Sequence, residues 1–323
     1  ALPDAPPLAP VTARVRSETC RGQHALRHRM AGLDYQETVN FSFVEERWEH
    51  ELAGNAEPIR VLNPIASPLA VMRTSLLGSL VQVLRYNLAR KAPRVRVFEI
   101  GRVFLRDAAV VESDTSVAGV RQPLRLAGLA FGGVDALQWG ARERATDFFD
   151  AKGDVEALLA PCVARFVPAQ HPAMHPGRCA AVELDGRAVG FVGEMHPKWR
   201  QGYELPSAPV LFELDVEAIS ARKLPEFVPI QRHQSVWRDI AVVAGDGVTH
   251  DELMQVIGEG AGALLKSVRL FDVYRPGGGG ERSLAVRLEL LDDTQPLTDE
   301  RIEASVAAVL DRLGQRLGAR LRG

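Results

Sequence analysis

The sequence predicts an α+β fold in two parts, an antiparallel sheet flanked by helices followed by a smaller β-α-β-β-α-β unit. At about 150 residues per domain, the 323 residues exceed what one ordinary core needs. Short runs rich in β-branched and aromatic residues are separated by hairpin-length and helix-length gaps, which is typical of antiparallel sheets that carry helices. The stretch 224–229 contains two prolines and no periodicity, so it predicts a boundary between two units.

The composition places the chain among globular proteins and excludes two other classes. Hydrophobic residues make up 46% and charged residues 25% of the sequence, a balance that excludes a chain disordered throughout. No apolar stretch approaches the roughly 20 residues that a membrane-spanning helix needs. Residues 1–10 lack the basic and apolar blocks of a signal peptide. We therefore expect a cytoplasmic protein without a membrane partner.

Charge and cysteine content restrict the possible ligands. The formal net charge is −2, whereas a general nucleic-acid binder carries a basic excess that attracts phosphates. Any contact with RNA must therefore be local. Cys20, Cys162 and Cys179 have no paired spacing, so the sequence predicts reduced thiols instead of a disulfide framework or a thiolate zinc site.

The first predicted elements follow a proline-rich segment. Four prolines within residues 1–16 disfavour a helix or a central strand, so we expect an extended linker from an upstream domain. A polar helix is predicted over 17–31, with Gly32 at its end. Residues 38–43 alternate as a half-buried strand does. The side chains expected to face the core are Val39, Phe41 and Phe43.

Apolar spacing and β-rich runs define the remaining elements of the first unit. The leucines and valines between 76 and 88 fall on one face of a helix. Residues 94–104 predict a long strand with a bend at Gly101. A helix is predicted over 152–159, with Asp150 as its N-cap. Further strands are predicted near 124–131, 180–184, 189–192 and 210–214.

The C-terminal unit shows strands and helices in a self-contained order. Thr249 to Glu252 form a capping box that opens its first helix, and Thr298 caps the second. Gly277 to Gly280 predict a flexible turn. The strands are predicted at 237–243, 264–274, 283–291 and 319–322. The resulting order, β-α-β-β-α-β, is that of a ferredoxin-like unit.

Several short motifs resemble the beta subunit of bacterial phenylalanyl-tRNA synthetase, and they occur in the order found in that family. In the first unit they lie at 32–43, 63–64, 72–77, 86–87, 95–104, 147–153, 175–177 and 190–197. In the second unit they lie at 237–242, 271–274 and 283–286. Two positions depart from the family pattern. His233-Gln234 replaces Phe-Pro, and Gln295-Pro296-Leu297 replaces Arg-Thr-Leu.

The resemblance implies a function for each unit. Residues 17–223 would be a degenerate, non-catalytic copy of the class II synthetase fold that docks the catalytic alpha subunit. Residues 224–323 would be an anticodon-binding domain for tRNA(Phe). The whole enzyme would be a heterotetramer of two alpha and two beta subunits. It would use ATP and Mg²⁺ to attach phenylalanine to tRNA(Phe), and neither would bind to this part of it.

A working class II site needs an arginine against the ATP α-phosphate and a glycine-rich strand that leads to a second arginine. Arg96 and Glu99 lie where the first group is expected, but Arg96 is also consistent with a strand arginine paired to an acid. Gly190 and Gly193 lead to Glu194 instead of an arginine. We therefore predict no catalytic residue in this chain. Two alternatives stay open, a self-sufficient adenylate-forming enzyme and a ligand-sensing ferredoxin-like module.

Two other groups of residues have the composition of metal sites. His171, His175 and Cys179 are metal-capable, but the prolines among them exclude a shared helical face, and a turn is the competing interpretation. Asp147, Asp150 and Asp154 stand at a predicted helix start, where carboxylates cap the helix and complement its dipole. We predict no metal site.

The predicted RNA contacts lie on the open face and rim of the ferredoxin-like sheet. Trp237, Phe271 and Tyr274 are candidates for stacking on bases, and Arg238, Arg275, Arg282 and Arg287 for contacting phosphates or base edges. Strict alternation would place Phe271 and Tyr274 on opposite faces, so that only one of them is exposed. From 224 to 323 the chain has 12 basic and 15 acidic residues, a net charge of −3, which favours selective contacts over a basic patch.

Overall fold

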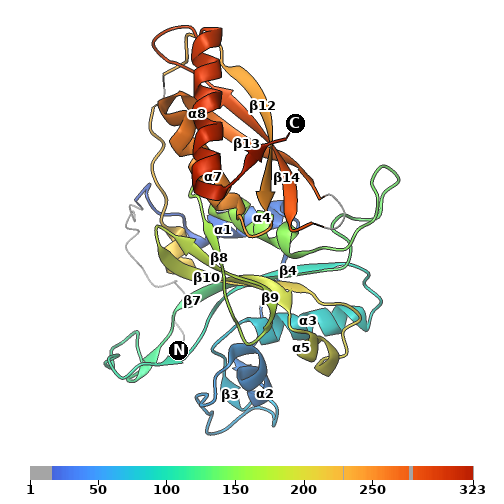
Figure 1. Ribbon diagram of the computed structural model, residues 1–323. Helices are drawn as coiled ribbons and strands as arrows, with labels where there is room; N and C mark the ends of the chain where they lie inside the picture. Colours follow the sequence, from blue (N-terminus) through green and yellow to red (C-terminus); the bar gives the residue numbers. More distant parts are fainter. Residues whose placement is uncertain (1–16, 228, 276–278, 323) are drawn as a thin grey trace. The chain divides into compact units, whose positions relative to one another are not determined.

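The computed structural model describes residues 17–227, 229–275 and 279–322 (Figure 1). The chain divides into two compact units, one ending at Pro225 and the other starting at Glu226. The segment 1–16 and the first half of the turn predicted at 277–280 lie outside the described residues. None of the described helices is both long and apolar enough to cross a membrane.

The N-terminal unit is built on a seven-stranded sheet with the order β1-β4-β7-β11-β10-β9-β8. Only β1 pairs parallel with its neighbour, and the other pairs are antiparallel, as predicted. The strands are β1 (Gln36–Glu37), β4 (Val95–Arg102), β7 (Leu124–Phe131), β8 (Arg165–Pro168), β9 (Met174–Leu184), β10 (Arg187–Met195) and β11 (Val210–Asp215).

Helices and short hairpins surround this sheet. The helices are α1 (Gln23–Gly32), α2 (Glu46–Trp48), α3 (Leu77–Leu88), α4 (Phe148–Leu159), α5 (Pro197–Gly202) and α6 (Val216–Ser220), with a π-helical turn at Glu49–Ala53. One hairpin pairs β2 (Phe43–Val44) with β3 (Val71–Met72), and a second pairs β5 (Leu105–Arg106) with β6 (Val120–Arg121). Figure 1 shows α3 on one side of the sheet and α1 with α4 on the other.

Both faces of this sheet are buried because its strands are apolar at successive positions. Val95 and Val97 of β4 pack against α3, whereas Phe98 packs with α1 and α4 on the opposite side. The predicted apolar face of α3 is confirmed, since Leu80 and Leu84 are fully buried. The strands of a sheet that is covered on both sides have nearly continuous hydrophobic sequences, which explains the residue pattern of β4 and β7.

The strand predicted at 38–43 is wrong. Val39 and Phe41 are 91% and 68% exposed, and the chain leaves the sheet after β1. Beyond β1, Asn40 Nδ2 donates to Glu99 Oε2 of β4 at 2.7 Å, a bond between positions 59 residues apart. The local alternation of residues in 38–43 does not record a contact of this range.

Two helix starts also differ from their prediction. The first helix begins at Gln23, six residues later than expected, because the chain forms a turn near Cys20. The N-cap of α4 is Asp147, whose side chain accepts from the backbone N–H of Phe149 and Asp150. Asp150 instead closes the capping box by accepting from the N–H of Asp147. A capping box has one polar residue at the N-cap and a second three residues later. Asp147 and Asp150 occupy these two positions, and the sequence alone favoured Asp150 as the N-cap.

Three carboxylates hold the loop that joins β3 to α3, and two of them, Glu49 and Glu99, are buried. Glu49 accepts from the N–H and hydroxyl of Thr74 at 3.0 and 2.5 Å. Glu99 pairs with Arg73 at 2.7 Å, and both side chains are less than 5% exposed. Glu213 of β11 accepts from the N–H of Leu76 at 2.6 Å, and burial raises its pKa. Buried charges persist only when paired or hydrogen-bonded in this way.

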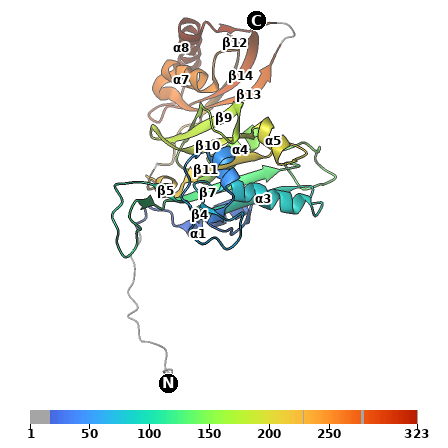
Figure 2. The same cartoon turned by 90° about the horizontal axis from the view of Figure 1, so that it is seen from below.

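The C-terminal unit has the ferredoxin-like architecture predicted from the sequence. Its elements are β12 (Val236–Gly245), α7 (His250–Ala261), a 3-10 turn (Gly262–Leu264), β13 (Leu265–Tyr274), β14 (Glu281–Leu290), α8 (Asp299–Leu317) and β15 (Arg320–Leu321). The sheet order is β13-β14-β12-β15, entirely antiparallel. Both helices pack on the same side of this sheet (Figure 2). No described helix of this unit covers the other side.

A capping box fixes the start of α7, and a close approach of the two helices fixes the crossing of α7 with α8. The predicted capping box is confirmed, since Thr249 and Glu252 hydrogen-bond each other reciprocally. Gly260 of α7 faces α8, and a Cβ atom there would lie 2.8 Å from Cα of Val309. Glycine is therefore required at this helix crossing.

A glycine in the first sheet provides a test of its packing. In β7 a Cβ on Gly128 would lie 2.2 Å from Cζ of Phe212. Gly128→Ala should therefore overpack this core and lower the free energy of unfolding by about 1–3 kcal/mol. Urea unfolding followed by circular dichroism measures this change.

Gly153→Ala is the matched control. Gly153 lies inside α4, and a Cβ there would meet no atom within 4 Å. Replacing a helical glycine in open space should stabilise the protein by about 0.5–1 kcal/mol. Equal stabilities for the two variants would contradict the packing described around Phe212.

Candidate nucleic-acid interface

The open side of the C-terminal sheet is defined by the pairing of β12 with β14. Asp239 pairs with Arg287, and Trp237 pairs with Glu289, so these four side chains share one face. The side chains at the alternate positions of β12, including Val242, point to the opposite face and enter the core beneath the helices. Trp237 is 52% exposed and therefore available for stacking.

A β-bulge brings Phe271 onto this open face. Leu270 pairs with Val286 and Asp272 with Ala285, so Phe271 has no partner on β14. The expectation that only one of the two aromatic residues of β13 is exposed is wrong, because Phe271 and Tyr274 are both 51% exposed. A bulge inserts one residue and breaks the alternation from which the expectation was drawn.

Arg287 lies at the centre of this face, where two groups hold it. Its Nε and Nη2 donate to the two carboxylate oxygens of Asp239, each at 2.7 Å. Its Cζ lies 5.3 Å from the ring centroid of Phe271, within cation–π distance. The hydrogen bonds from Arg287 also lower the pKa of Asp239.

A second pair of this kind involves Tyr274 and Arg322. Arg322 Cζ lies 5.2 Å from the ring centroid of Tyr274. The N–H of Arg322 donates to the carbonyl of Ala241 at 2.8 Å, and its Nη1 donates to Ser283 Oγ at 3.5 Å. The sequence reasoning missed Arg322, although its place within the edge strand predicted at 319–322 was a usable signal.

The other predicted arginines lie elsewhere. Arg238 pairs with Leu288 and therefore faces the helix side, where its Nη2 is 3.9 Å from Asp299. Arg275 lies 3.9 Å from Asp246, and Arg282 donates to the carbonyl of Val248. Of the seven predicted side chains, the structure brings four together on the open face. These are Trp237, Phe271, Tyr274 and Arg287.

Two cations on the open face were also missed. Arg269 pairs with Arg287 and is exposed. Lys266 Nζ donates to Glu289 at 2.7 Å, and Ser267 donates to the same carboxylate at 2.8 Å. Hydrogen bonds from Lys266, Ser235 and Ser267 lower the pKa of Glu289 to about 2.

In the N-terminal unit, the two residues considered for phosphate chemistry are both held in buried pairs. Arg96 pairs with Asp154 and stacks on Tyr35, whose hydroxyl also donates to Asp154 at 2.8 Å. Glu99 pairs with Arg73. Neither side chain is free to contact a nucleotide.

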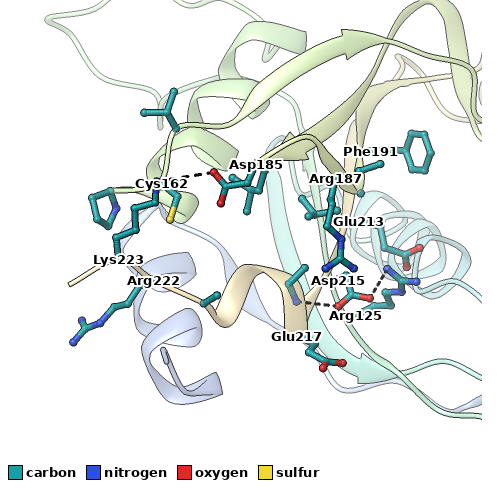
Figure 3. A pocket seen from close by; sticks show the side chains of 18 of the residues that line it. Arg125, Cys162, Asp185, Arg187, Phe191, Glu213, Asp215, Glu217, Arg222 and Lys223 are labelled. Atoms are coloured by element: carbon teal, nitrogen blue, oxygen red, sulfur yellow. Dashed lines mark hydrogen bonds and ion pairs between the residues drawn. The ribbon is translucent and has the colours of Figure 1, made fainter. Parts of the chain in front are cut away.

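A groove of about 960 Å³ runs along the ends of β7, β10 and β11 in the same unit (Figure 3). Its basic and acidic residues are nearly balanced. They are Arg121, Arg125, Arg187, Arg222 and Lys223, against Asp185, Glu213, Asp215 and Glu217. Two pairs cancel directly, with Arg125 3.2 Å from Asp215 and Lys223 4.0 Å from Asp185. The groove therefore lacks the concentrated positive charge that adenylate formation requires.

The histidines considered as metal ligands accept hydrogen bonds from backbone N–H groups two residues further along the chain. His171 Nδ1 accepts from the N–H of Ala173 at 3.2 Å, and His175 Nδ1 accepts from the N–H of Gly177 at 2.9 Å. Burial lowers the pKa of His171 to about 4. Within the described ranges, no group of three or more His, Cys, Asp or Glu is arranged to hold a metal ion.

Comparison with known families assigns both units. Residues 2–216 match the family described as the phenylalanyl tRNA synthetase beta chain CLM domain, which is more than half of the chain. The chain belongs to the phenylalanyl-tRNA synthetase beta chain family. Residues 231–322 match the ferredoxin-fold anticodon binding domain, in agreement with the β-α-β-β-α-β topology of the second unit.

Relatives from several bacteria carry the name phenylalanine–tRNA ligase beta subunit. The protein from Burkholderia pseudomallei (strain 1710b) is 50% identical over all of this chain and 41% of its own length. Those from Cupriavidus pinatubonensis and Chromobacterium violaceum are 48% and 45% identical, over 98% and 99% of this chain and 40% of theirs. The chain therefore spans about two fifths of the length of these relatives.

The pKa of Glu289 predicts a pH-dependent contribution to stability. A carboxylate with a lowered folded-state pKa stabilises the fold above its unfolded pKa, near 4.5, and loses that effect as the pH falls toward about 2. Glu289→Gln should therefore lower the thermal midpoint at pH 7. The difference from the wild type should shrink between pH 4.5 and 2. Calorimetry over this range measures it.

Glu226→Gln is the control for this titration, since Glu226 is exposed. It should leave the midpoint nearly unchanged at every pH. A Glu289→Gln difference that stays constant down to pH 2 would contradict the role given to its ionised form.

Proposed function

We propose that this chain is the part of a phenylalanine–tRNA ligase beta subunit that binds the anticodon region of tRNA(Phe) and docks the catalytic alpha subunit. Residues 224–323 would form the anticodon-binding domain, and 17–223 a class II synthetase-like platform. The observation that carries the proposal is the open sheet face, on which exposed aromatic side chains and fixed arginines lie together in a unit of the anticodon-binding family.

The chemistry of this face favours single-stranded RNA over a duplex. Unpaired loop bases are recognised by stacking on aromatic rings and guanidinium planes, whereas duplex binding depends on phosphate contacts. The unit from 224 to 323 has 12 basic and 15 acidic residues, so phosphate attraction alone is weak. Stacking must therefore supply most of the affinity, and the alpha subunit and other parts of the beta subunit would add contacts.

The N-terminal unit supports a non-catalytic role. Helices cover both faces of its sheet, and Arg96 and Glu99 are engaged in buried pairs. Phenylalanine activation with ATP and Mg²⁺ would then take place in the alpha subunit, in a heterotetramer of two alpha and two beta chains. The outer side of α3, where Tyr86 is 57% exposed, is a candidate surface for that partner.

The proposal predicts which side chains contribute to RNA binding. Arg287→Ala should weaken binding of the 323-residue chain to the anticodon stem-loop of tRNA(Phe) by about 10- to 100-fold, because a stacked base contributes about 1–3 kcal/mol. Fluorescence anisotropy with a labelled stem-loop measures the dissociation constant.

Arg316→Ala is the matched control. It removes the same charge from α8, where Arg316 pairs with Glu259 on the helix side. Its effect on binding should be less than about threefold, the size expected for one distant phosphate-attracting charge. Equal losses for the two variants, or no measurable binding by the wild type, would refute the anticodon role.

A further inference from the structure

The open face carries two aromatic–arginine pairs of similar geometry. Phe271 lies 5.3 Å from the guanidinium of Arg287, and Tyr274 lies 5.2 Å from that of Arg322. The two rings are three residues apart on β13, or about 10 Å at the usual rise of a strand. Bases that have left their stack in an RNA loop can occupy separate positions of this kind.

The first pair is distinguished by the carboxylate that holds its arginine. Asp239 accepts two parallel hydrogen bonds from Arg287, which leaves few of the rotamers of this long side chain accessible. Among the described residues, no hydrogen-bond acceptor engages the third guanidinium nitrogen, Nη1. That nitrogen is therefore positioned to donate to a base edge or a phosphate.

The contribution of this ion pair to stability is modest. The side chains of Arg287 and Asp239 are 48% and 45% exposed, and exposed ion pairs contribute little to folding. A negative charge on a surface that meets RNA is also unfavourable for attraction of phosphates. The carboxylate of Asp239 is thus better explained by its restriction of the Arg287 side chain than by its charge.

We propose that Asp239 is a positioning residue that fixes Arg287 beside Phe271, so that these side chains and the Tyr274–Arg322 pair form two stations for unstacked bases of one RNA loop. This inference rests on the proposed anticodon role and adds to it. It assigns Asp239 and Arg322 to the site, and it identifies the ligand as splayed bases instead of a phosphate backbone.

The decisive variant is Asp239→Asn, because two explanations predict opposite signs. If Asp239 acts only through its charge, its removal brings the surface closer to neutral and strengthens binding of the anticodon stem-loop. If Asp239 positions Arg287, the variant frees the guanidinium and weakens binding, by about tenfold for the loss of one stacking contact. Anisotropy titration of the 323-residue chain measures the change.

Glu281→Gln is the matched control. Glu281 accepts a bidentate pair of bonds from Arg320, also at 2.7 Å each, and pairs with Gly245 on the same sheet. Glu281→Gln removes the same charge and the same kind of ion pair as Asp239→Asn. Among the described residues, no aromatic ring contacts Arg320. Binding should be unchanged or slightly tighter. Equal thermal midpoints of the two variants exclude misfolding as the cause of a difference.

A second measurement tests the stacking itself. Stem-loops with one abasic nucleotide at each loop position should include one position at which Asp239→Asn causes no further loss, because the base held there is already missing. A merely structural role of Asp239 would give the same loss with every stem-loop.

The possible outcomes separate the two proposals. Unchanged or tighter binding by Asp239→Asn, with normal binding by the wild type, overturns the positioning role and leaves the anticodon role intact. A constant tenfold loss at every abasic position overturns the base station. Failure of the wild type to bind any stem-loop overturns both proposals.

Discussion

Side chains of a strand point alternately to two sides of its sheet, and helix coverage decides which side stays available to a ligand. In the N-terminal unit, α3 covers one side and α1 with α4 covers the other, so the sheet is a core on both faces. In the C-terminal unit, α7 and α8 pack on the same side. Among the described residues, the sheet of the C-terminal unit therefore has one side that no helix covers, and the proposed interface depends on that asymmetry.

The covered sheet of the N-terminal unit also supports the non-catalytic role proposed for it. Glu99 and Glu213 point from strands β4 and β11 toward the loop before α3. Glu99 holds it through a buried ion pair, and Glu213 through a hydrogen bond. These charged groups therefore satisfy the protein's own backbone and side chains.

Much of the architecture followed from the sequence because apolar periodicity and caps are local signals. The face of α3, the extent of β7 and the capping box at Thr249 needed only spacing and residue type. The prediction of a strand at 38–43 was wrong. In this segment Asn40 bonds to Glu99, which lies 59 residues further along the chain. No local pattern records such a contact.

The site was less predictable than the fold. Trp237 and Arg287 lie on the open face, and alternation along the strand that was predicted at 237–243 would have shown that Arg238 faces the helix side instead. The bulge at Phe271 was not recoverable, because it depends on how β13 meets β14 and not on the residue itself. Arg322 reaches the face only because the last strand pairs beside β12.

Photocrosslinking tests the central claim most directly. An anticodon stem-loop with a photoreactive base at successive loop positions would be irradiated with the 323-residue chain, and the attached peptide identified by mass spectrometry. The account predicts attachment to open-face segments of β12, β13 or β14, at or beside Trp237, Phe271, Tyr274 or Arg287. Attachment confined to the groove of the N-terminal unit, or to the outer surfaces of α7 and α8, would contradict it.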